Sequence, residues 1–247
     1  MDWSELSFWS WIILSICAVL IGMGKTGLSG TGMLVVPIMA AVFGGKPSAG
    51  LVLPMLCIAD LFAVVYYHRH ADWKHILKLL PWTIVGLIAA LLMGSGISDH
   101  TFKVMIGIMI LLSLAVMIWQ DYFKKSNEIP TSTWFSGLFG FGAGFSTMIG
   151  NAAGPLMAIY LLSARLPKNA YIGTGAWFFL IVNYTKVPLQ IVFWKNITFH
   201  TLTLNFLMIP AIAVGAFLGF KLVKIIPEKA YRIFILVSTA VSAVFMF

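Results

Sequence analysis

The stretch that decides the fold of this chain is GKTGLSGTG at residues 24–32, in the middle of the apolar segment 8–43. Four of these nine residues are glycine, and each glycine in a helix interior costs about 1 kcal/mol relative to alanine. The stretch is therefore a poor helix interior, whereas the apolar residues on both sides are typical of helices. We predict a hairpin at residues 8–43, made of two helices separated by a polar, glycine-rich tip.

A second stretch of the same kind, GAGFSTMIG at residues 142–150, lies in the segment 131–163, where we predict a second hairpin. Around the two stretches, glycine and proline landmarks recur in an unbroken order. The recurring landmarks are Gly22, Gly24, Gly32 and Pro37 at an offset of 118 residues, Pro47 at 120, and Pro81 and Gly86 at 129. This order indicates an internal duplication. We predict repeats at residues 1–120 and 134–247, joined by a linker at residues 121–133.

The composition excludes an ordinary soluble domain. Of the 247 residues, 60% are hydrophobic and 10% are charged, whereas a soluble domain is about 25% charged. After its hairpin, each repeat has three further apolar segments that are suited to crossing a bilayer. These predicted spans are residues 49–67, 79–97 and 103–120 in the first repeat, and residues 170–194, 201–220 and 230–247 in the second. The expected fold class is an all-α, polytopic membrane protein.

The positions of Lys and Arg favour hairpins that return to their starting side over kinked single spans. Fourteen of the sixteen basic residues lie outside the apolar spans. With single crossings they divide 6 to 8 between the two sides of the membrane. With hairpins they divide 11 to 3, which is the asymmetry expected of a cytoplasmic face. The three basic residues left on the outer side are Lys46, Lys103 and Lys195.

Hairpins leave three true crossings in each repeat, so the second repeat is inverted relative to the first. We therefore expect a multi-pass protein of the cell (inner) membrane whose two termini face away from the cytoplasm. Inverted repeats with broken helices are the architecture of many secondary transporters. Unwound backbone at membrane depth is tolerated only where it is buried in protein or lines a cavity, so the two tips are expected to meet at one site.

Three charged residues lie well inside the predicted membrane segments: Lys25, Asp60 and Lys186. Ionisable groups at that depth are costly and are functional candidates by default. Two lysines and two helix N-termini around one cavity favour an anionic substrate. Two alternatives stay open, because Lys25 could pair with Asp60 as a structural bridge and either lysine could snorkel to an interface. Asp60 is a candidate for proton coupling, or else a counter-ion for Lys25.

Neutral polar residues at the tips, and one on the span 170–194, could complete the substrate site. They are Thr26, Ser29, Thr31, Ser146, Thr147, Asn151 and Asn183. Their side chains suit hydrogen bonds to an oxyanion, and the alternative role is capping of the helix that follows each tip. We expect no metal, no cofactor and no nucleic-acid partner, since the net charge of +8 is accounted for by membrane orientation.

These features predict a secondary transporter for a small anion that works by alternating access between the two halves. An intramembrane enzyme is disfavoured, because the spans contain no histidine and no pair of acidic residues. A non-transporting membrane assembly or accessory protein is a further alternative, although it would have no need for two buried lysines, and a channel is the remaining possibility. The expected partners are the lipid bilayer and the small anion, and the sequence leaves the oligomeric state open, a homodimer included.

Several motifs resemble those of the TauE/SafE family of sulfite and organosulfonate exporters. They are LVVP at residues 34–37, GNAAGP at 150–155, YLL at 160–162, LPKN at 166–169 and NYTKVP at 183–188. The resemblance covers nearly the whole chain, roughly residues 10–245. It implies export, without ATP, of a small sulfur-containing anion such as sulfite or an organosulfonate.

Many relatives in that family carry a run of three glycines at the tips, whereas this chain has GTG at residues 30–32 and GFS at residues 144–146. The tips therefore depart from the family pattern at the place where an anion would bind. Import of another small anion stays an alternative, because the direction of transport is implied by the resemblance alone.

Overall fold

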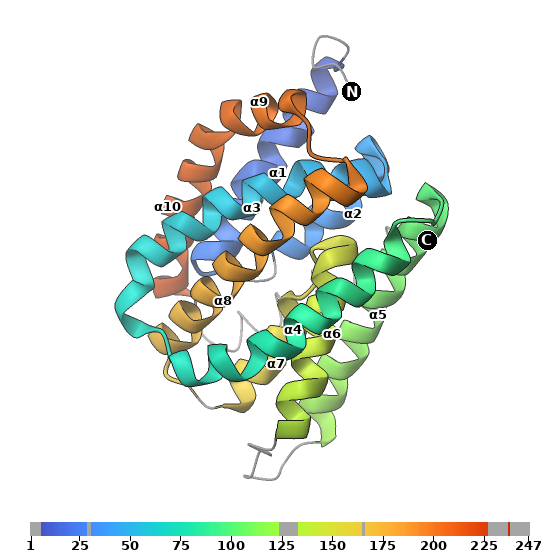
Figure 1. Ribbon diagram of the computed structural model, residues 1–247. Coiled ribbons are helices and arrows are strands. Elements are labelled where there is room, and N and C mark those ends of the chain that lie inside the picture. The colour runs from blue at the N-terminus through green and yellow to red at the C-terminus, as the bar shows by residue number, and fades with distance from the viewer. Residues whose placement is uncertain (1–5, 29–30, 124–132, 165, 227–236, 238–247) are drawn as a thin grey trace.

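The structure, a computed structural model, describes residues 6–28, 31–123, 133–164, 166–226 and 237. Within these residues every regular element is a helix (Figure 1). The elements are α1 (Phe8–Thr26), α2 (Thr31–Phe43), α3 (Gly45–Tyr67), η2 (His68–His70), α4 (Trp73–Gly94), α5 (Asp99–Phe123), α6 (Thr133–Gly150), α7 (Gly154–Ser163), α8 (Lys168–Leu189), η3 (Gln190–Trp194), α9 (Phe199–Leu207) and α10 (Ile209–Ile225). Most of the predicted linker and of the last predicted span, 230–247, lies outside the described residues.

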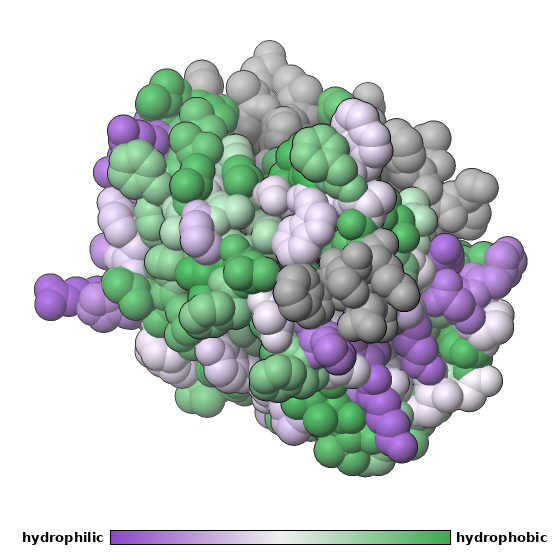
Figure 2. All heavy atoms as spheres, turned by 90° about the horizontal axis from the view of Figure 1, so that it is seen from above, coloured by the Kyte–Doolittle hydropathy of each residue, from purple (hydrophilic) through white to green (hydrophobic). Residues whose placement is uncertain are grey.

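The expected all-α membrane fold is confirmed. Four stretches, Phe8–Thr26, Gly45–His70, Trp73–Gly94 and Asn169–Trp194, are long and apolar enough to cross a bilayer, and α9 with α10 forms a fifth if that bent pair is one span. Large apolar side chains face outward along these helices; Val65, Leu92 and Phe206 are each more than 70% exposed. Apolar residues reach the perimeter of the molecule when it is seen from above (Figure 2). Such a surface is suited to lipid rather than to water.

The first hairpin breaks where the glycine-rich stretch begins. The α1 helix is capped at its start by the Ser7 side chain, which accepts a hydrogen bond from the Ser10 N–H, and it ends at Thr26. The Thr31 hydroxyl donates to the carbonyl oxygens of Leu20 and Leu28, which ties the start of α2 to α1. The thirteen residues of α2 span only about 20 Å, less than the ~30 Å hydrocarbon core. In Figure 1, α2 runs back toward the end of the molecule at which α1 begins.

The second hairpin turns at Asn151, which has a left-handed backbone with φ of 55°. Asparagine is the residue other than glycine that tolerates this conformation best, and it commonly ends helices. The ten residues of α7 span about 15 Å, so this arm is also too short to cross the bilayer. The two hairpins enter from opposite ends of the molecule, since α1 begins at the upper end of Figure 1 and α6 at the lower end.

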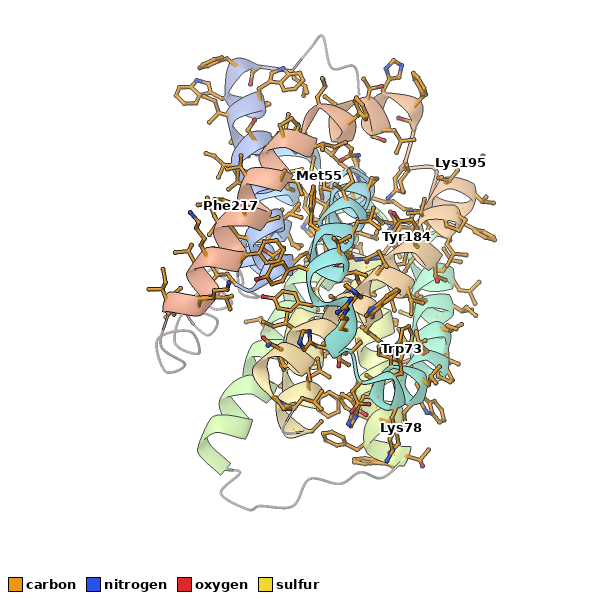
Figure 3. All side chains as sticks on the ribbon, turned by 90° about the vertical axis from the view of Figure 1, so that its left-hand side faces the viewer. Met55, Trp73, Lys78, Tyr184, Lys195 and Phe217 are labelled. Atoms are coloured by element: carbon orange, nitrogen blue, oxygen red, sulfur yellow. The ribbon has the colours of Figure 1, made fainter. Side chains whose placement is uncertain are left out.

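We call the two ends the N-terminal end, where α1 and α9 begin, and the linker end, where α5 stops and α6 begins. Lys195 lies toward the N-terminal end and Lys78 at the linker end (Figure 3). The basic residues Lys46 and Lys195 share the N-terminal end, because the Asn196 side chain donates to the Lys46 carbonyl oxygen.

Helices at equivalent positions in the two halves make reciprocal contacts. The α1 helix of the first hairpin packs on α10, whereas the α6 helix of the second hairpin packs on α4. Both interfaces rest on glycine: a Cβ on Gly215 would collide with the backbone of Val19, and one on Gly144 with that of Thr83. Between these pairs, α3 packs antiparallel on α8. Small residues let helix backbones approach in this way within membranes.

Two of the predicted spans are not straight helices. The span predicted at 201–220 is bent by 49° between α9 and α10. A capping box of Thr198 and Thr201 starts α9, while Pro210 stands in the first turn of α10, where its missing N–H is no loss. The span predicted at 170–194 continues past Pro188 as a π-helical turn, η3. Proline removes an intrahelical hydrogen bond, so irregular winding next to it has a local cause.

A carboxylate from the start of α5 satisfies the first N–H groups of α3. Asp99 accepts hydrogen bonds from the backbone N–H groups of Gly45 at 3.1 Å and Lys46 at 2.8 Å. Partial burial alone would raise the pKa of Asp99, but these N–H groups, helped by Lys103 at 3.8 Å, hold that pKa below its ordinary value. The lowered pKa means that the ionised carboxylate stabilises the fold at neutral pH.

We expect Asp99→Ala to lower the free energy of unfolding at pH 7 by about 1 kcal/mol, the usual effect of losing a helix N-cap. Because the folded pKa is depressed, this stabilisation is complete above the ordinary Asp value of about 3.9 and is lost as the pH falls through the folded pKa. Thermal unfolding of the purified protein in detergent at pH 7 and at pH 3 tests this. The control is Lys103→Gln, which leaves both N–H contacts. If the unfolding temperatures of wild type and Asp99→Ala differ by the same amount at pH 7 and at pH 3, the ionised Asp99 carboxylate is not what stabilises the start of α3.

Candidate functional site

The tips of the two hairpins line one cavity of about 100 Å³ near the middle of the molecule. A cavity that holds one water measures about 10–15 Å³, so this one has room for a small anion and a few waters. Its lining residues are Ile21, Gly24, Lys25, Gly27, Gly32, Leu56, Thr147, Asn151, Gly154, Met157, Ala158, Leu161, Tyr171, Ile172, Gly175, Ala176, Phe179 and Asn183. They come from both hairpins and from α3 and α8, the two helices that pack between them.

Lys25, in the last turn of α1, reaches the carboxylate of Asp60 in α3. Its Nζ lies 2.8 Å from Asp60 Oδ1 and 4.1 Å from the centre of the Phe179 ring. The Asp60 side chain is fully buried, whereas that of Lys25 keeps 15% of its surface exposed. Of the two alternatives left open by the sequence, the ion pair with Asp60 is therefore present. Lys25 also lines the cavity, so the ion pair leaves part of its side chain available there.

Hydrogen bonds continue from Asp60 across α8 to the second hairpin. The Asn183 Nδ2 donates to Asp60 Oδ2 at 2.7 Å, and the Asn183 Oδ1 accepts from Lys186 Nζ at 3.3 Å. Lys186 Nζ also donates to Thr147 Oγ1 at 3.0 Å and to Asn151 Oδ1 at 2.5 Å. Together with Lys25, these residues form a set of six that we call the polar network: Lys25, Asp60, Thr147, Asn151, Asn183 and Lys186. It joins both tips through α3 and α8.

Lys186 is fully buried, and its ammonium group donates to three protein oxygens. An ammonium group has three donors, so in this arrangement each of them is used within the protein. Lys186 does not line the cavity itself. Its direct effect is to hold Thr147, Asn151 and Asn183, all of which do line the cavity.

The second helix of each hairpin begins at the cavity. Gly32 is the second residue of α2 and Gly154 the first of α7, and both line the cavity. A helix N-terminus carries unpaired N–H groups and a partial positive charge, so it attracts anions. A Cβ placed on Gly32 would meet nothing within 4 Å, which shows that open space lies directly beside the start of α2.

The formal charges of the polar network do not cancel. It contains two ammonium groups, on Lys25 and Lys186, and one carboxylate, on Asp60. An uncompensated charge is costly away from water, so the surplus positive charge favours the entry of a counter-ion. The partial positive charges at the N-termini of α2 and α7 also favour an anion. The side chains of the polar network thus leave one formal positive charge without a carboxylate partner.

The predicted site residues fall into three groups. Lys25, Thr147, Asn151 and Asn183 line the cavity, while Asp60 and Lys186 lie behind its wall. The hydroxyls of three further residues donate to backbone carbonyl oxygens instead of facing the cavity: Thr26 to Gly22 and Ala216, Thr31 to Leu20 and Leu28, and Ser146 to Ala143. Ser29 lies outside the described residues.

Sequence reasoning missed the apolar part of the cavity wall. This part includes Met157 and Leu161 of α7 and Tyr171 and Phe179 of α8. Phe179 could have been found, since it precedes Asn183 by one helical turn and so shares its face of α8. The others carry no local signal, because an apolar residue in an apolar helix looks the same whether it faces lipid, protein or a cavity.

A family model described as "Sulfite exporter TauE/SafE" matches residues 14–246, nearly the whole chain. No curated protein and no solved structure was found to match the chain.

We expect Asp60→Asn to destabilise the protein by about 3 kcal/mol, the cost of leaving a buried charge without its partner. The double variant Lys25→Met/Asp60→Asn removes both charges of the pair and should recover more than half of that loss. Thermal unfolding of wild type, the single variants Lys25→Met and Asp60→Asn, and the double variant in detergent measures both effects. Additive losses in the double variant would show that Lys25 and Asp60 do not form a stabilising pair.

Proposed function

The chain belongs to the TauE/SafE sulfite exporter family, and from that premise we propose that it is a secondary transporter that moves a small sulfur-containing anion out of the cell. The substrate class is sulfite or an organosulfonate. The observation that carries the proposal is the surplus positive charge of the polar network beside a cavity on which two helix N-termini converge. In many secondary transporters with broken helices, the N-termini of the half-helices point at anionic groups of the substrate near the membrane centre.

Three features support alternating access between two inverted repeats. The hairpins enter from opposite ends of the molecule, α2 and α7 are too short to cross the bilayer, and α1 packs on α10 as α6 packs on α4. In this proposal the hairpins move relative to the other helices and expose the anion first to one side and then to the other. The polar network links both hairpins to α3 and α8, so it changes partners during that movement.

From the Lys and Arg count we infer that the linker end faces the cytoplasm and that both termini face away from it. On α8, the lining residues Tyr171, Ile172, Gly175 and Ala176 come from the half of the helix nearer the linker end. The anion then enters from the cytoplasm in the state that the structure represents. A membrane potential negative inside assists its exit by about 2.3 kcal/mol per charge per 100 mV.

In this proposal the residues around the cavity have different roles. Lys25 contacts the anion and exchanges part of its interaction with Asp60 for it. Thr147, Asn151 and Asn183 donate hydrogen bonds or orient water around it, while Lys186 holds their side chains in place and adds charge from behind. Asp60 stays the candidate for proton coupling, because protonation would release Lys25 fully to the anion.

We expect proteoliposomes with the purified protein to take up labelled sulfite in a saturable manner. Lys25→Gln should lower the initial rate about tenfold or more, the loss expected when one charge-assisted hydrogen bond is removed. Lys221→Gln is the matched control, because it removes the same charge from an exposed side chain that packs on Phe217. Equal rates in wild type and Lys25→Gln would contradict the proposed site, and no uptake by the wild type would favour an accessory role.

The open space beside Gly32 allows a test by steric block. Gly32→Val places its Cβ where no atom lies within 4 Å, in the open space at the cavity, so uptake should fall while the unfolding temperature changes little. Gly96→Val is the control, because its Cβ also meets nothing within 4 Å but it lies in an exposed loop outside the cavity. If both valine variants transport at the wild-type rate, the anion does not pass beside the start of α2.

A further inference from the structure

We propose that a second anion site lies at the N-terminal end, in a cavity lined by Lys46 and Lys195 that we call the outer cavity. An anion that leaves the central cavity binds at this second site next. The cavity measures about 310 Å³. Its lining residues are Phe43, Lys46, Pro47, Leu51, Trp194, Lys195, Asn196, Thr198, Thr201 and Leu204. The site itself is argued from this cavity; only its place on an export path rests on the proposed function.

Charge is concentrated in this outer cavity. Lys46 and Lys195 are two of the three basic residues that the topology assigns to the N-terminal end outside the spans, the third being Lys103. No acidic residue lines the cavity. The nearby carboxylate of Asp99 is engaged by the backbone N–H groups of Gly45 and Lys46 and by Lys103. Two ammonium groups without a carboxylate beside them make this cavity suited to an oxyanion.

Each lysine keeps donors for a ligand. Lys46 Nζ donates to the Gly94 carbonyl oxygen at 2.8 Å and lies 5.7 Å from the centre of the Trp194 ring, which leaves two of its three N–H groups. Lys195 is exposed and has a left-handed backbone with φ of 52°, directly after the π-helical turn. The start of α9, at Thr198 and Thr201, adds a helix N-terminus to the same wall.

A line of side chains with polar groups runs along α8 and η3 between the two cavities. Asn183, Lys186, Gln190 and Trp194 follow one another at intervals of three or four residues, so they share one face of the helix. Asn183 lines the central cavity, and Trp194 lines the outer one. The line therefore leads from one anion site to the other, past the buried ammonium group of Lys186.

Gln190 is the unusual member of this line. Its side chain is fully buried, and among the described residues neither Nε2 nor Oε1 makes a hydrogen bond. A buried amide without partners costs about 1–3 kcal/mol. We assign the hydrogen bonds of the Gln190 amide to the anion, or to water bound to that anion, as it passes during transport. Gln190 also begins the π-helical turn, and such turns frequently mark functional sites.

The barrier between the two cavities is short. On α3, Leu56 lines the central cavity and Leu51 the outer one, and five residues of helix correspond to about 8 Å. The Asn151 side chain, which donates to the Ala49 carbonyl oxygen, lies across this interval. A small change in the second hairpin would thus be enough to join the two sites.

The outer site can be tested by protection of a cysteine reporter, independently of transport. Pro47→Cys places a thiol at an exposed position in the lining, and the natural residues Cys17 and Cys57 are buried. We expect sodium methanesulfonate, at constant ionic strength, to slow the reaction of this thiol with a membrane-impermeant maleimide. Lys195→Gln should raise the concentration for half-protection about tenfold, as expected for one charge-assisted hydrogen bond.

Two controls separate this site from other effects. Lys103→Gln removes the same charge at the same end of the molecule but lies outside the lining, so protection should be unchanged. A thiol at Gly96→Cys, in a loop at the same end, should react at one rate with or without the anion. Absence of protection at Pro47→Cys, equal protection at Gly96→Cys, or the same half-protection in Lys195→Gln would each overturn the proposal.

The transport-deficient background Lys25→Gln distinguishes this inference from the proposed function. Protection that persists in Lys25→Gln shows an outer site that binds anions by itself. Protection together with no sulfite flux in the wild type would support the outer site and contradict the transport function. Sulfite flux in the wild type without protection of the thiol in Pro47→Cys would support the transport function and contradict the outer site.

Discussion

The interaction on which the rest of the structure depends is the ion pair between Lys25 and Asp60. The bilayer core offers no water, so a charge at that depth needs a partner supplied by the fold. Lys25 stands at the end of α1 and Asp60 inside α3, and the pair fixes the depth at which the first hairpin turns. Because Asn183 bridges Asp60 to Lys186, the same pair also orients the wall that the second hairpin contributes.

Glycine allows this polar centre to be assembled from two hairpins. Gly22 and Gly219 bring α1 and α10 together, and Gly86 and Gly144 do the same for α4 and α6, since a Cβ at any of these positions would collide with neighbouring atoms. These close pairs hold the longer arms in place. The shorter arms, α2 and α7, begin at the cavity, and the partial positive charges of their N-termini add to the formal positive charge that the side chains leave without a partner.

Local chemistry explains what could be predicted from the sequence. The breaks near Gly27 and Asn151 follow from glycine content and helix-ending residues, and apolar runs mark the spans. The pairing of Lys25 with Asp60 could be suggested but not chosen, because it depends on how α1 and α3 are rotated about their axes. For the same reason the hydroxyls of Thr31 and Ser146 were expected at the anion, whereas they donate to backbone carbonyl oxygens. The 49° bend between α9 and α10 lies beside Pro210, so the sequence carried a signal for it that the prediction of one straight span did not use.

The central claim is that unbalanced positive charge, rather than cavity shape, selects the ligand. Calorimetric titration of the purified protein with methanesulfonate and with methanesulfonamide tests it most directly, because the two molecules have nearly the same shape and only the first is charged. The account predicts saturable binding of methanesulfonate and no measurable binding of methanesulfonamide. Equal affinity for the two, or binding of the neutral compound alone, would contradict it.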